Sequence, residues 1–432
     1  MHRPCYDRTE LKEVVDVISG YAFPGYEMGS SGSPIIKIKN IIPPMVDTTD
    51  VDRISEVFIA SIPKLKKFRL KHKDILIAMT GATVGKIGRF PKANEIFYLN
   101  QRVARVDLRN PAQADIDYIY YVLSQTQYTD QIFSLADGSA QANVSASQIG
   151  NITMPLPPLP EQRRIAHILG TLDDNIENNR KTAKALEAMA QAIFKSWFVD
   201  FDPVRSKMNG ESRESICKRL KITPEILDLF PDRLVDSELG EIPEGWEVGT
   251  IIDIATISSG KRPENRLERP SEDAHIPLWG GNGPIGFVTE PLIYESCILT
   301  GRVGTLGTFF RINTPCWPSD NTLIIRAIKN AYYEYVFFNI SQIDMTLLNR
   351  GSTQPLLTQS DLSSQPIVIP SSDIIGSFHD VSYTLLQYAN FFSLNYSYVV
   401  IARDTLLPKL ISGEIRVPEA KYCVEAAMSG EV

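Results

Sequence analysis

The residues with the clearest cofactor-binding spacing are Gly281, Gly283 and Gly286, which match the G-x-G-x-x-G pattern of dinucleotide-binding loops. Such a loop follows a buried strand and opens a helix, because the helix N-terminus must face the pyrophosphate. Here the segment that follows, GFVTEPLIY, has strand character and contains Pro291. No acidic ribose ligand stands in the right place after it. The sequence therefore favours a tight turn in a sheet over a cofactor site.

Other catalytic patterns are missing from the sequence. Neither a P-loop of the form G-x₄-G-K-[ST] nor the N-P-P-[YF] motif of methyltransferases occurs. Pro231-Asp232 is not followed by the E-x-K of a nuclease site. We therefore expect the chain to carry out no catalysis of its own.

The cysteines and histidines lack the spacing of a metal site or a disulfide framework. No C-x-x-C pair and no H-x₃-H pair occurs. Widely separated thiols of this kind predict reduced, structural cysteines and no metal or cofactor in this chain. The five cysteines are Cys5, Cys217, Cys297, Cys316 and Cys423.

Positive charge is concentrated in one stretch of the first half. Eleven basic residues lie from Lys64 to Arg105, against only Asp74 and Glu95, although the whole chain has a net charge of −7. Phosphate contacts dominate DNA affinity and need such a concentration of charge. The stretch therefore favours DNA binding over the alternative of a solvated surface. In the second half the basic residues are diluted by acidic ones.

Arg, Lys, Asn and Gln side chains on loops can make paired hydrogen bonds with base edges. Residues of these types form the candidate DNA-binding set in both halves, although the sequence does not separate base contacts from phosphate contacts. The candidates are Lys64, Lys66, Lys67, Arg69, Lys86, Arg89, Asn100, Gln101, Arg102, Lys261, Arg262, Arg266, Asn282, Arg302 and Asn321.

The second half of the chain resembles the first. The segments LIAMTGATVGKIG (76–88) and CILTGRVGTLG (297–307) each end a strand-like run in Thr-Gly followed by V-G-x-x-G. GSAQ at Gly138 returns as GSTQ at Gly351, and the same offset continues through the following segment. This pattern predicts a duplication, with a globular domain followed by a helix, twice.

Each globular half contains short runs rich in β-branched residues and punctuated by Gly, Pro and Asn, which predict strands. Helical segments are expected at about 116–131 and 331–348. We therefore expect two mixed α/β domains with curved sheets, spanning 1–158 and 245–372.

A long helix is predicted after each domain, over 159–200 and 373–416. Apolar residues recur there at alternating spacings of three and four, which is typical of a coiled coil, although core helices of a bundle are the alternative. Asn179 interrupts the first series, and Ser382 and Arg403 interrupt the second. The positions expected to set the register between the helices are Ile165, Leu169, Leu172, Ile176, Asn179, Leu186, Ile193, Phe378, Leu385, Phe392, Val399 and Leu406.

Between the halves, residues 201–244 are rich in charge and proline and predict a linker with one short helix. Residues 417–432 are expected to form a C-terminal tail. No run of 18 apolar residues and no secretory signal occurs, so we expect a cytoplasmic protein.

The segment from PLPPLPEQRRIAHILG to KSWFVDFDPV resembles the central repeat of specificity subunits from type I restriction-modification systems. ELGEIPEGWEV is similar to the entry of their second target recognition domain, and LLPKLISGEIRV to the end of their distal repeat. The second helical repeat departs from the first, with IGSF at Ile375 in place of the E-Q-R-R entry.

The resemblance implies an α/β (α+β) fold of two target recognition domains joined by two antiparallel helices in a pseudo-two-fold repeat. It implies sequence-specific binding of a bipartite double-stranded DNA target. Two modification subunits are implied as partners that supply S-adenosylmethionine, and restriction subunits as partners that supply ATP-driven translocation and Mg-dependent cleavage. The alternatives are a nuclease with an unrecognised site and a coiled-coil scaffold that does not bind DNA.

Overall fold

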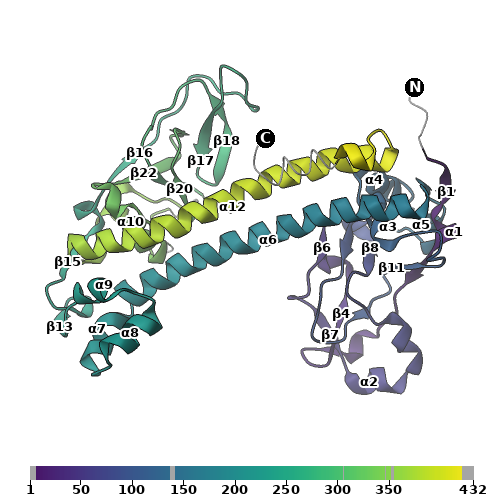
Figure 1. Ribbon diagram of the computed structural model, residues 1–432, viewed down its shortest axis with the longest axis horizontal. Coiled ribbons are helices and arrows are strands. Elements are labelled where there is room, and N and C mark those ends of the chain that lie inside the picture. Colours follow the sequence, from purple (N-terminus) through teal and green to yellow (C-terminus); the bar gives the residue numbers. More distant parts are fainter. Residues whose placement is uncertain (1–5, 137–141, 305, 346, 352–354, 421–432) are drawn as a thin grey trace. The chain divides into compact units, whose positions relative to one another are not determined.

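The computed structural model describes residues 6–136, 142–304, 306–345, 347–351 and 355–420 (Figure 1). They form two compact units. Unit 1 comprises residues 1–180 and 393–432, and unit 2 comprises residues 181–392. None of the described helices is long and apolar enough to cross a membrane.

Unit 1 is built on two mixed sheets. In the six-stranded sheet, buried residues of the central strands contribute to separate cores on the two faces. Its strands, in sheet order, are β2 (Val15–Ser19), β11 (Val103–Leu108), β8 (Ile75–Ala78), β9 (Ile87–Arg89), β6 (Met45–Val46) and β5 (Ile41–Ile42). The four-stranded sheet contains β10 (Tyr98–Leu99), β4 (Ser33–Ile36), β7 (Asp52–Ile54) and β3 (Met28–Gly29), and β1 (Arg8–Glu10) pairs with β12 (Thr153–Pro155).

Short helices complete this unit. The helix expected at 116–131 is two helices, α3 (Ile116–Leu123) and α4 (Thr126–Ser134). The Asp115 carboxylate caps α3 by accepting from the Tyr118 backbone N–H at 3.0 Å, which fixes where α3 begins. The others are α1 (Leu11–Val14), α2 (Glu56–Ser61), α5 (Ala146–Gly150) and the 3₁₀ helix η3 (Pro63–Phe68).

Unit 2 repeats this plan with a central antiparallel sheet of β16 (Ala255–Ser259), β22 (Thr322–Ala327), β19 (Cys297–Gly301) and β20 (Phe309–Ile312). The helix expected at 331–348 is α10 (Tyr333–Gln342). Further elements are β17 (Ile276–Gly280), β18 (Gly283–Val288), β21 (Trp317–Pro318), the pair β15 (Glu247–Thr250) and β23 (Pro366–Ile369), and α11 (Gln359–Ser363).

The duplication is visible in the backbone hydrogen bonds. In unit 1 the Gly20 N–H donates to the Val103 carbonyl at 3.0 Å, and in unit 2 the Gly260 N–H donates to the Thr322 carbonyl at 3.1 Å. Likewise the Gly81 and Gly304 N–H groups donate to the carbonyls of Ala142 and Pro355. Equivalent strand ends in the two units are therefore joined by the same backbone hydrogen bonds, and we call this arrangement the shared backbone frame. Gly138 and much of both GSAQ-type repeats lie outside the described residues.

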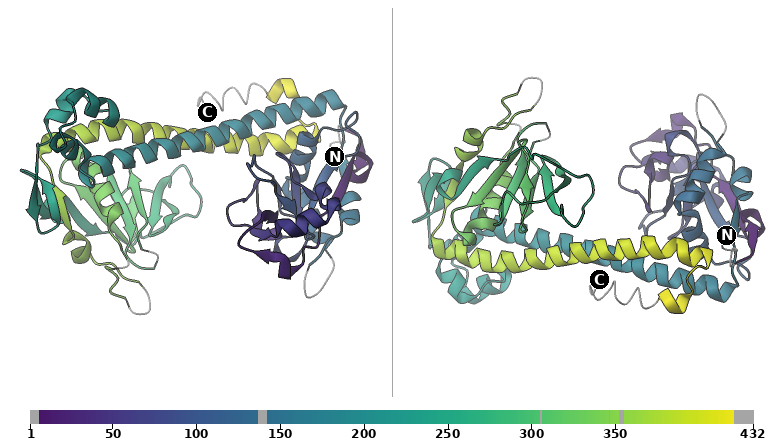
Figure 2. Two further views of the ribbon diagram at one scale, coloured as in Figure 1. Left: turned by 90° about the horizontal axis from the view of Figure 1, so that it is seen from below. Right: turned by 90° about the horizontal axis from the view of Figure 1, so that it is seen from above.

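The two predicted long helices are α6 (Leu159–Phe198) and α12 (Ser372–Ser412) (Figure 2). In unit 1 the beginning of α6 shares a core with the end of α12, and in unit 2 the end of α6 packs on the beginning of α12. Rings of Phe194 and Trp197 lie 5.9 and 6.1 Å from the ring of Phe378. This is the antiparallel pairing that the resemblance implied.

The expected register positions differ in burial. Six of them are buried, namely Ile165, Leu169, Leu172, Phe378, Val399 and Leu406. Ile176, Ile193 and Leu385 pack at the margins of the two cores. Asn179, Leu186 and Phe392 are half-buried.

The linker prediction for 201–244 was wrong. This segment folds into α7 (Asp202–Met208), α8 (Arg213–Leu220), α9 (Pro224–Asp228) and a hairpin of β13 (Leu234–Ser237) and β14 (Gly240–Pro243). Ser212 and Thr223 cap α8 and α9, and these caps compensate for the charged, proline-containing composition. Val204, Ile216 and Phe230 are buried in the core of unit 2, so the segment belongs to that unit.

Candidate nucleic-acid interface

In unit 1, three strand ends meet at one edge of the six-stranded sheet: the end of β2, the end of β8 and the start of β11. The Gln101 N–H donates to the Tyr21 carbonyl at 2.9 Å, and the Met79 N–H donates to the Arg102 carbonyl at 3.0 Å. We call this region, Ser19–Tyr21, Met79–Gly81 and Asn100–Arg102, the strand-end edge of unit 1. A Cβ atom at Gly20 would lie 2.2 Å from the Asn100 carbonyl oxygen, so only glycine allows this close approach.

The predicted residues at this edge differ in access to solvent. Gln101 and Arg102 are exposed, so a ligand can reach both. Asn100 is only 7% exposed and lies on the turn that joins β10 to β11. The structure therefore leaves Gln101 and Arg102 as the accessible polar candidates of this turn.

The basic helix η3 lies beside the same edge. The Lys64 ammonium is 5.5 Å from the ring centre of Tyr21, and that ring is 5.8 Å from the ring of Phe68. Lys64, Lys66 and Lys67 are exposed. Arg69 is half-buried, because its Nε donates to the Tyr98 hydroxyl at 3.2 Å.

Two predicted residues of unit 1 lie elsewhere. Arg89 is held inside the unit, with its guanidinium 2.7 Å from the Asp117 carboxylate and 3.9 Å from the ring centre of Tyr120. Its surroundings indicate a packing role. Lys86 is exposed and lines a cavity of about 600 Å³ that also contacts Asp173 of α6 and Tyr396 of α12.

The strand-end edge of unit 2 comprises Ser259–Arg262, Gly301–Arg302 and Ser319–Asn321. The Lys261 N–H donates to the Pro318 carbonyl and the Arg302 N–H to the Asn321 carbonyl, both at 3.0 Å. Four of the candidates therefore gather here, namely Lys261, Arg262, Arg302 and Asn321. Arg302 is half-buried and the other three are exposed.

Asn282 joins this edge from the G-x-G-x-x-G segment. Strands β17 and β18 pair antiparallel with Gly280 opposite Gly283, so Gly281 and Asn282 form the turn, as the sequence predicted. A Cβ atom at Gly281 would lie 2.9 Å from the Gly301 Cα, which places this turn against the end of β19. Arg266 is exposed on the segment that precedes β17 and has no described contact with the edge residues.

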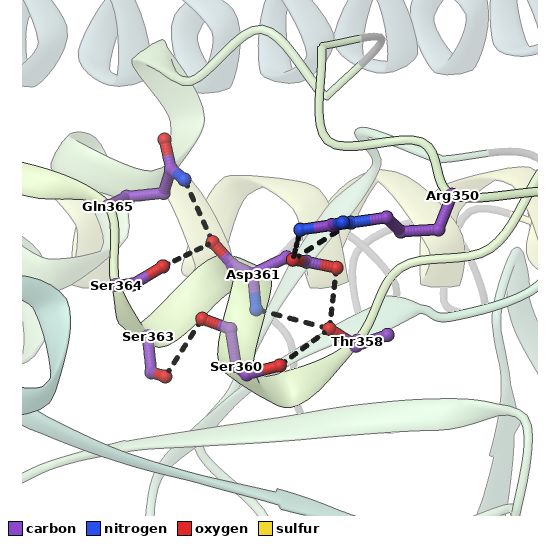
Figure 3. A network of polar contacts seen from close by, with 7 residues as sticks. All are labelled: Arg350, Thr358, Ser360, Asp361, Ser363, Ser364 and Gln365. Atoms are coloured by element: carbon purple, nitrogen blue, oxygen red, sulfur yellow. Dashed lines mark hydrogen bonds and ion pairs between the residues drawn. The ribbon is translucent and has the colours of Figure 1, made fainter.

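A braced loop flanks Arg302. The Leu357 N–H donates to the Arg302 carbonyl at 2.8 Å, and the loop is closed by the Arg350 guanidinium, 2.7 Å from the Asp361 carboxylate (Figure 3). The Thr358 hydroxyl donates to the same carboxylate at 2.6 Å and accepts the Asp361 N–H at 3.1 Å. The ion pair with Arg350 and the hydrogen bond from Thr358 lower the pKa of Asp361, so its carboxylate stays ionised and keeps both contacts.

The sequence analysis did not predict these contacts among Arg350, Thr358 and Asp361. The only signal for them was the repeated G-S-[AT]-Q segment, which marks where the loop begins. Within the described residues, no group of three or more His, Cys, Asp or Glu side chains is arranged to hold a metal ion.

Comparison with known families identifies the family of this chain. The family described as "Type I restriction modification DNA specificity domain" matches residues 6–188 and 243–403. The chain belongs to this family. As a type I specificity subunit it provides DNA sequence specificity, and the two matched segments agree with the observed duplication.

Relatives of this specificity subunit occur in archaea and bacteria. The type I restriction enzyme MjaIX specificity subunit of Methanocaldococcus jannaschii is 26% identical over 326 residues, covering 70% of each chain. The HindI specificity subunit of Haemophilus influenzae is 24% identical, covering 69% of this chain and 77% of the relative.

The fold is also found in a solved structure. The S subunit of a type I restriction-modification system from M. genitalium superposes with a TM-score of 0.65 and 18% identity, covering 95% of this chain and 97% of that one. This agreement confirms the mixed α/β fold with two long helices.

Proposed function

We propose that each unit reads one half of a bipartite DNA target through its strand-end edge. The observation that carries this proposal is that the two edges share one backbone frame and present different side chains. Gln101 and Arg102 occupy the frame in unit 1, whereas Asp320 and Asn321 follow the equivalent strand end in unit 2. Two modules of one design with different contact residues suit two different half-sites.

Basic residues around each edge support phosphate binding. In unit 1 these are Lys64, Lys66 and Lys67, and in unit 2 Lys261 and Arg262, all exposed. Lysine and arginine contacts to phosphates supply much of DNA affinity without carrying sequence information. We assign these residues to positioning the duplex at the edges.

The two long helices extend through both units. Each contributes residues to both units, and a helix of this length extends about 60 Å at about 1.5 Å per residue. We propose that α6 and α12 set the gap between the half-sites.

Partner subunits would dock on the helices. In unit 1, α12 has exposed apolar side chains at spacings of four and three, namely Leu394, Tyr398 and Ile401, which are 42–62% exposed. Such a stripe suits helices of a second protein. We propose two modification subunits as occupants along the helix pair, and restriction subunits further out in the complex.

The chain itself would perform no catalysis. S-adenosylmethionine would bind to the modification subunits, and ATP and Mg to the restriction subunits, with adenine methylation and cleavage carried out there. Because its ligand is genomic DNA, we propose that the chain works in the cytoplasm.

Exchange of one unit tests the bipartite assignment. Residues 1–155 are replaced by the matching segment of a relative, and methylated adenines are mapped by single-molecule sequencing in cells that contain the modification subunits. One half of the modified sequence should change and the other should persist. A change in both halves, or in neither, would refute the assignment. The purified chain alone should show no methylation, ATPase or nuclease activity.

A further inference from the structure

The side chains of Met79 in unit 1 and Arg302 in unit 2 differ in chemistry, although their backbones are held in the same way. Met79 in unit 1 and Arg302 in unit 2 make the same backbone bonds: their N–H groups donate to Arg102 and Asn321 carbonyls, both at 3.0 Å. Their carbonyls accept the N–H groups of Val144 at 3.0 Å and of Leu357 at 2.8 Å. The same frame thus presents a thioether in unit 1 and a guanidinium in unit 2.

The neighbouring serine is also retained. The Ser19 hydroxyl lies 3.7 Å from the Met79 sulfur, and the Ser259 hydroxyl lies 3.4 Å from Nη1 of Arg302. In unit 2 the Ser259 hydroxyl also accepts from Nε2 of Gln359 at 2.8 Å.

The residue that supports this serine differs between the units. Gln359 is the first residue of α11 in unit 2, and the first residue of the equivalent helix α5 in unit 1 is Ala146. Ala146 has no group that could hold a serine hydroxyl. At these three equivalent positions unit 2 therefore has arginine, serine and glutamine, whereas unit 1 has methionine, serine and alanine.

The guanidinium of Arg302 is positioned by a hydrogen bond, but not all of its N–H donors have a partner. Its described side-chain hydrogen bond goes to Ser259, while its Nε is buried without a hydrogen-bond partner. The buried hydroxyls of Thr300 and Ser319, beside the same strand ends, also lack a partner. A partly buried cation with unused donors is costly unless an acceptor completes its shell. The buried Nε is out of reach of a ligand, but Arg302 is half-exposed and its described side-chain bond uses Nη1, so the outer edge of the guanidinium can meet an acceptor from outside.

We propose that Arg302 contacts a guanine in the half-site bound by unit 2, and that Ser259 and Gln359 are positioning residues for it. The inference rests on the proposed function of the edges. A guanidinium held at fixed orientation matches the two acceptors of guanine, O6 and N7, in the major groove. Phosphate contacts at this edge can be supplied by the exposed Lys261 and Arg262.

The test uses the full chain with its modification subunits and a library of randomised DNA duplexes, whose bound fraction is sequenced. Arg302→Met places in unit 2 the residue that the same frame carries in unit 1, so the fold is expected to tolerate it. Guanine enrichment at one position of one half-site should fall about tenfold to a hundredfold, and the other half-site should keep its preference. Met79→Leu is the matched control and should leave the half-site of unit 2 unchanged.

The positioning residues are tested in the same library. Ser259→Ala and Gln359→Ala should weaken the guanine preference at the same position, and Ser259→Thr, which keeps the hydroxyl, should restore it. Thermal unfolding of these variants should match the original chain.

Three results would overturn the inference: an unchanged motif in Arg302→Met, an equal loss of affinity for all sequences, or a loss of preference across the whole half-site with a lower melting temperature. If the original complex enriches no bipartite motif, the proposed function of the edges fails, and the inference fails with it. That result is distinguishable because it precedes any substitution.

Discussion

Removing the positive charge of η3 should flatten the dependence of DNA binding on salt. We consider the triple change of Lys64, Lys66 and Lys67 to Ala. All three are exposed beside the strand-end edge of unit 1, whereas Arg69 bonds to Tyr98 and is left in place. Each phosphate contact adds about 0.9 to the slope of log affinity against log salt, so losing three lowers the slope by about 2.7.

The assay measures dissociation constants of the complete complex for one duplex between about 50 and 200 mM salt. Over this fourfold range, a slope lower by about 2.7 corresponds to about 40-fold less loss of affinity with salt. Binding should weaken to a similar extent on matched and mismatched duplexes, because phosphates carry no sequence information. Changing the same three residues to Arg keeps the charge and should keep the slope. An unchanged slope in the Ala variant would show that η3 is only a solvated surface.

Two further predictions concern the helices. Inserting seven residues after Ala183 and seven after Tyr396 lengthens both helices by about 10 Å. The modified site should then keep its two half-sites with a gap changed by about three base pairs, or no stable complex should form. Efficient methylation at the original gap would refute the proposal that the helices set the gap. Phe194→Ala should lower the free energy of unfolding by about 3–5 kcal/mol in urea denaturation, because Phe194 is 1% exposed and its ring packs against those of Phe338, Tyr335 and Phe378. Phe391→Ala, at a side chain 52% exposed, should change it by less than about 0.5 kcal/mol.

Repeating patterns made the long helices and the duplication predictable from sequence. Residues such as Leu169 and Leu172 recur at spacings that bring them to one face of a helix, and that information is local. The strands were predictable because their signal, short runs of β-branched residues bounded by Gly, Pro and Asn, is also local. By contrast, the core role of Phe194 depends on α10 and α12, which are far away in the chain.

The candidate site was only partly predictable because charge alone does not show where a side chain points. Arg89 and Lys66 occur in the same basic stretch, yet Arg89 is engaged by Asp117 and Tyr120 while Lys66 is exposed. Those partners are fixed by tertiary packing and have no local signal. Ser259 and Gln359 were missed for the same reason, since their contact joins residues 100 positions apart.

The division of the chain has a consequence for its synthesis. Unit 1 is assembled from both ends of the chain, because Val399, Leu406 and Leu410 share its core with Ile165, Leu169 and Leu172. Unit 2 is continuous, so all of its residues leave the ribosome before α12 is complete. During that interval the core of unit 1 lacks Val399, Leu406 and Leu410, and incompletely covered apolar surface of this kind makes nascent chains prone to aggregation. The completion of α12 thus decides when the core of unit 1 is complete.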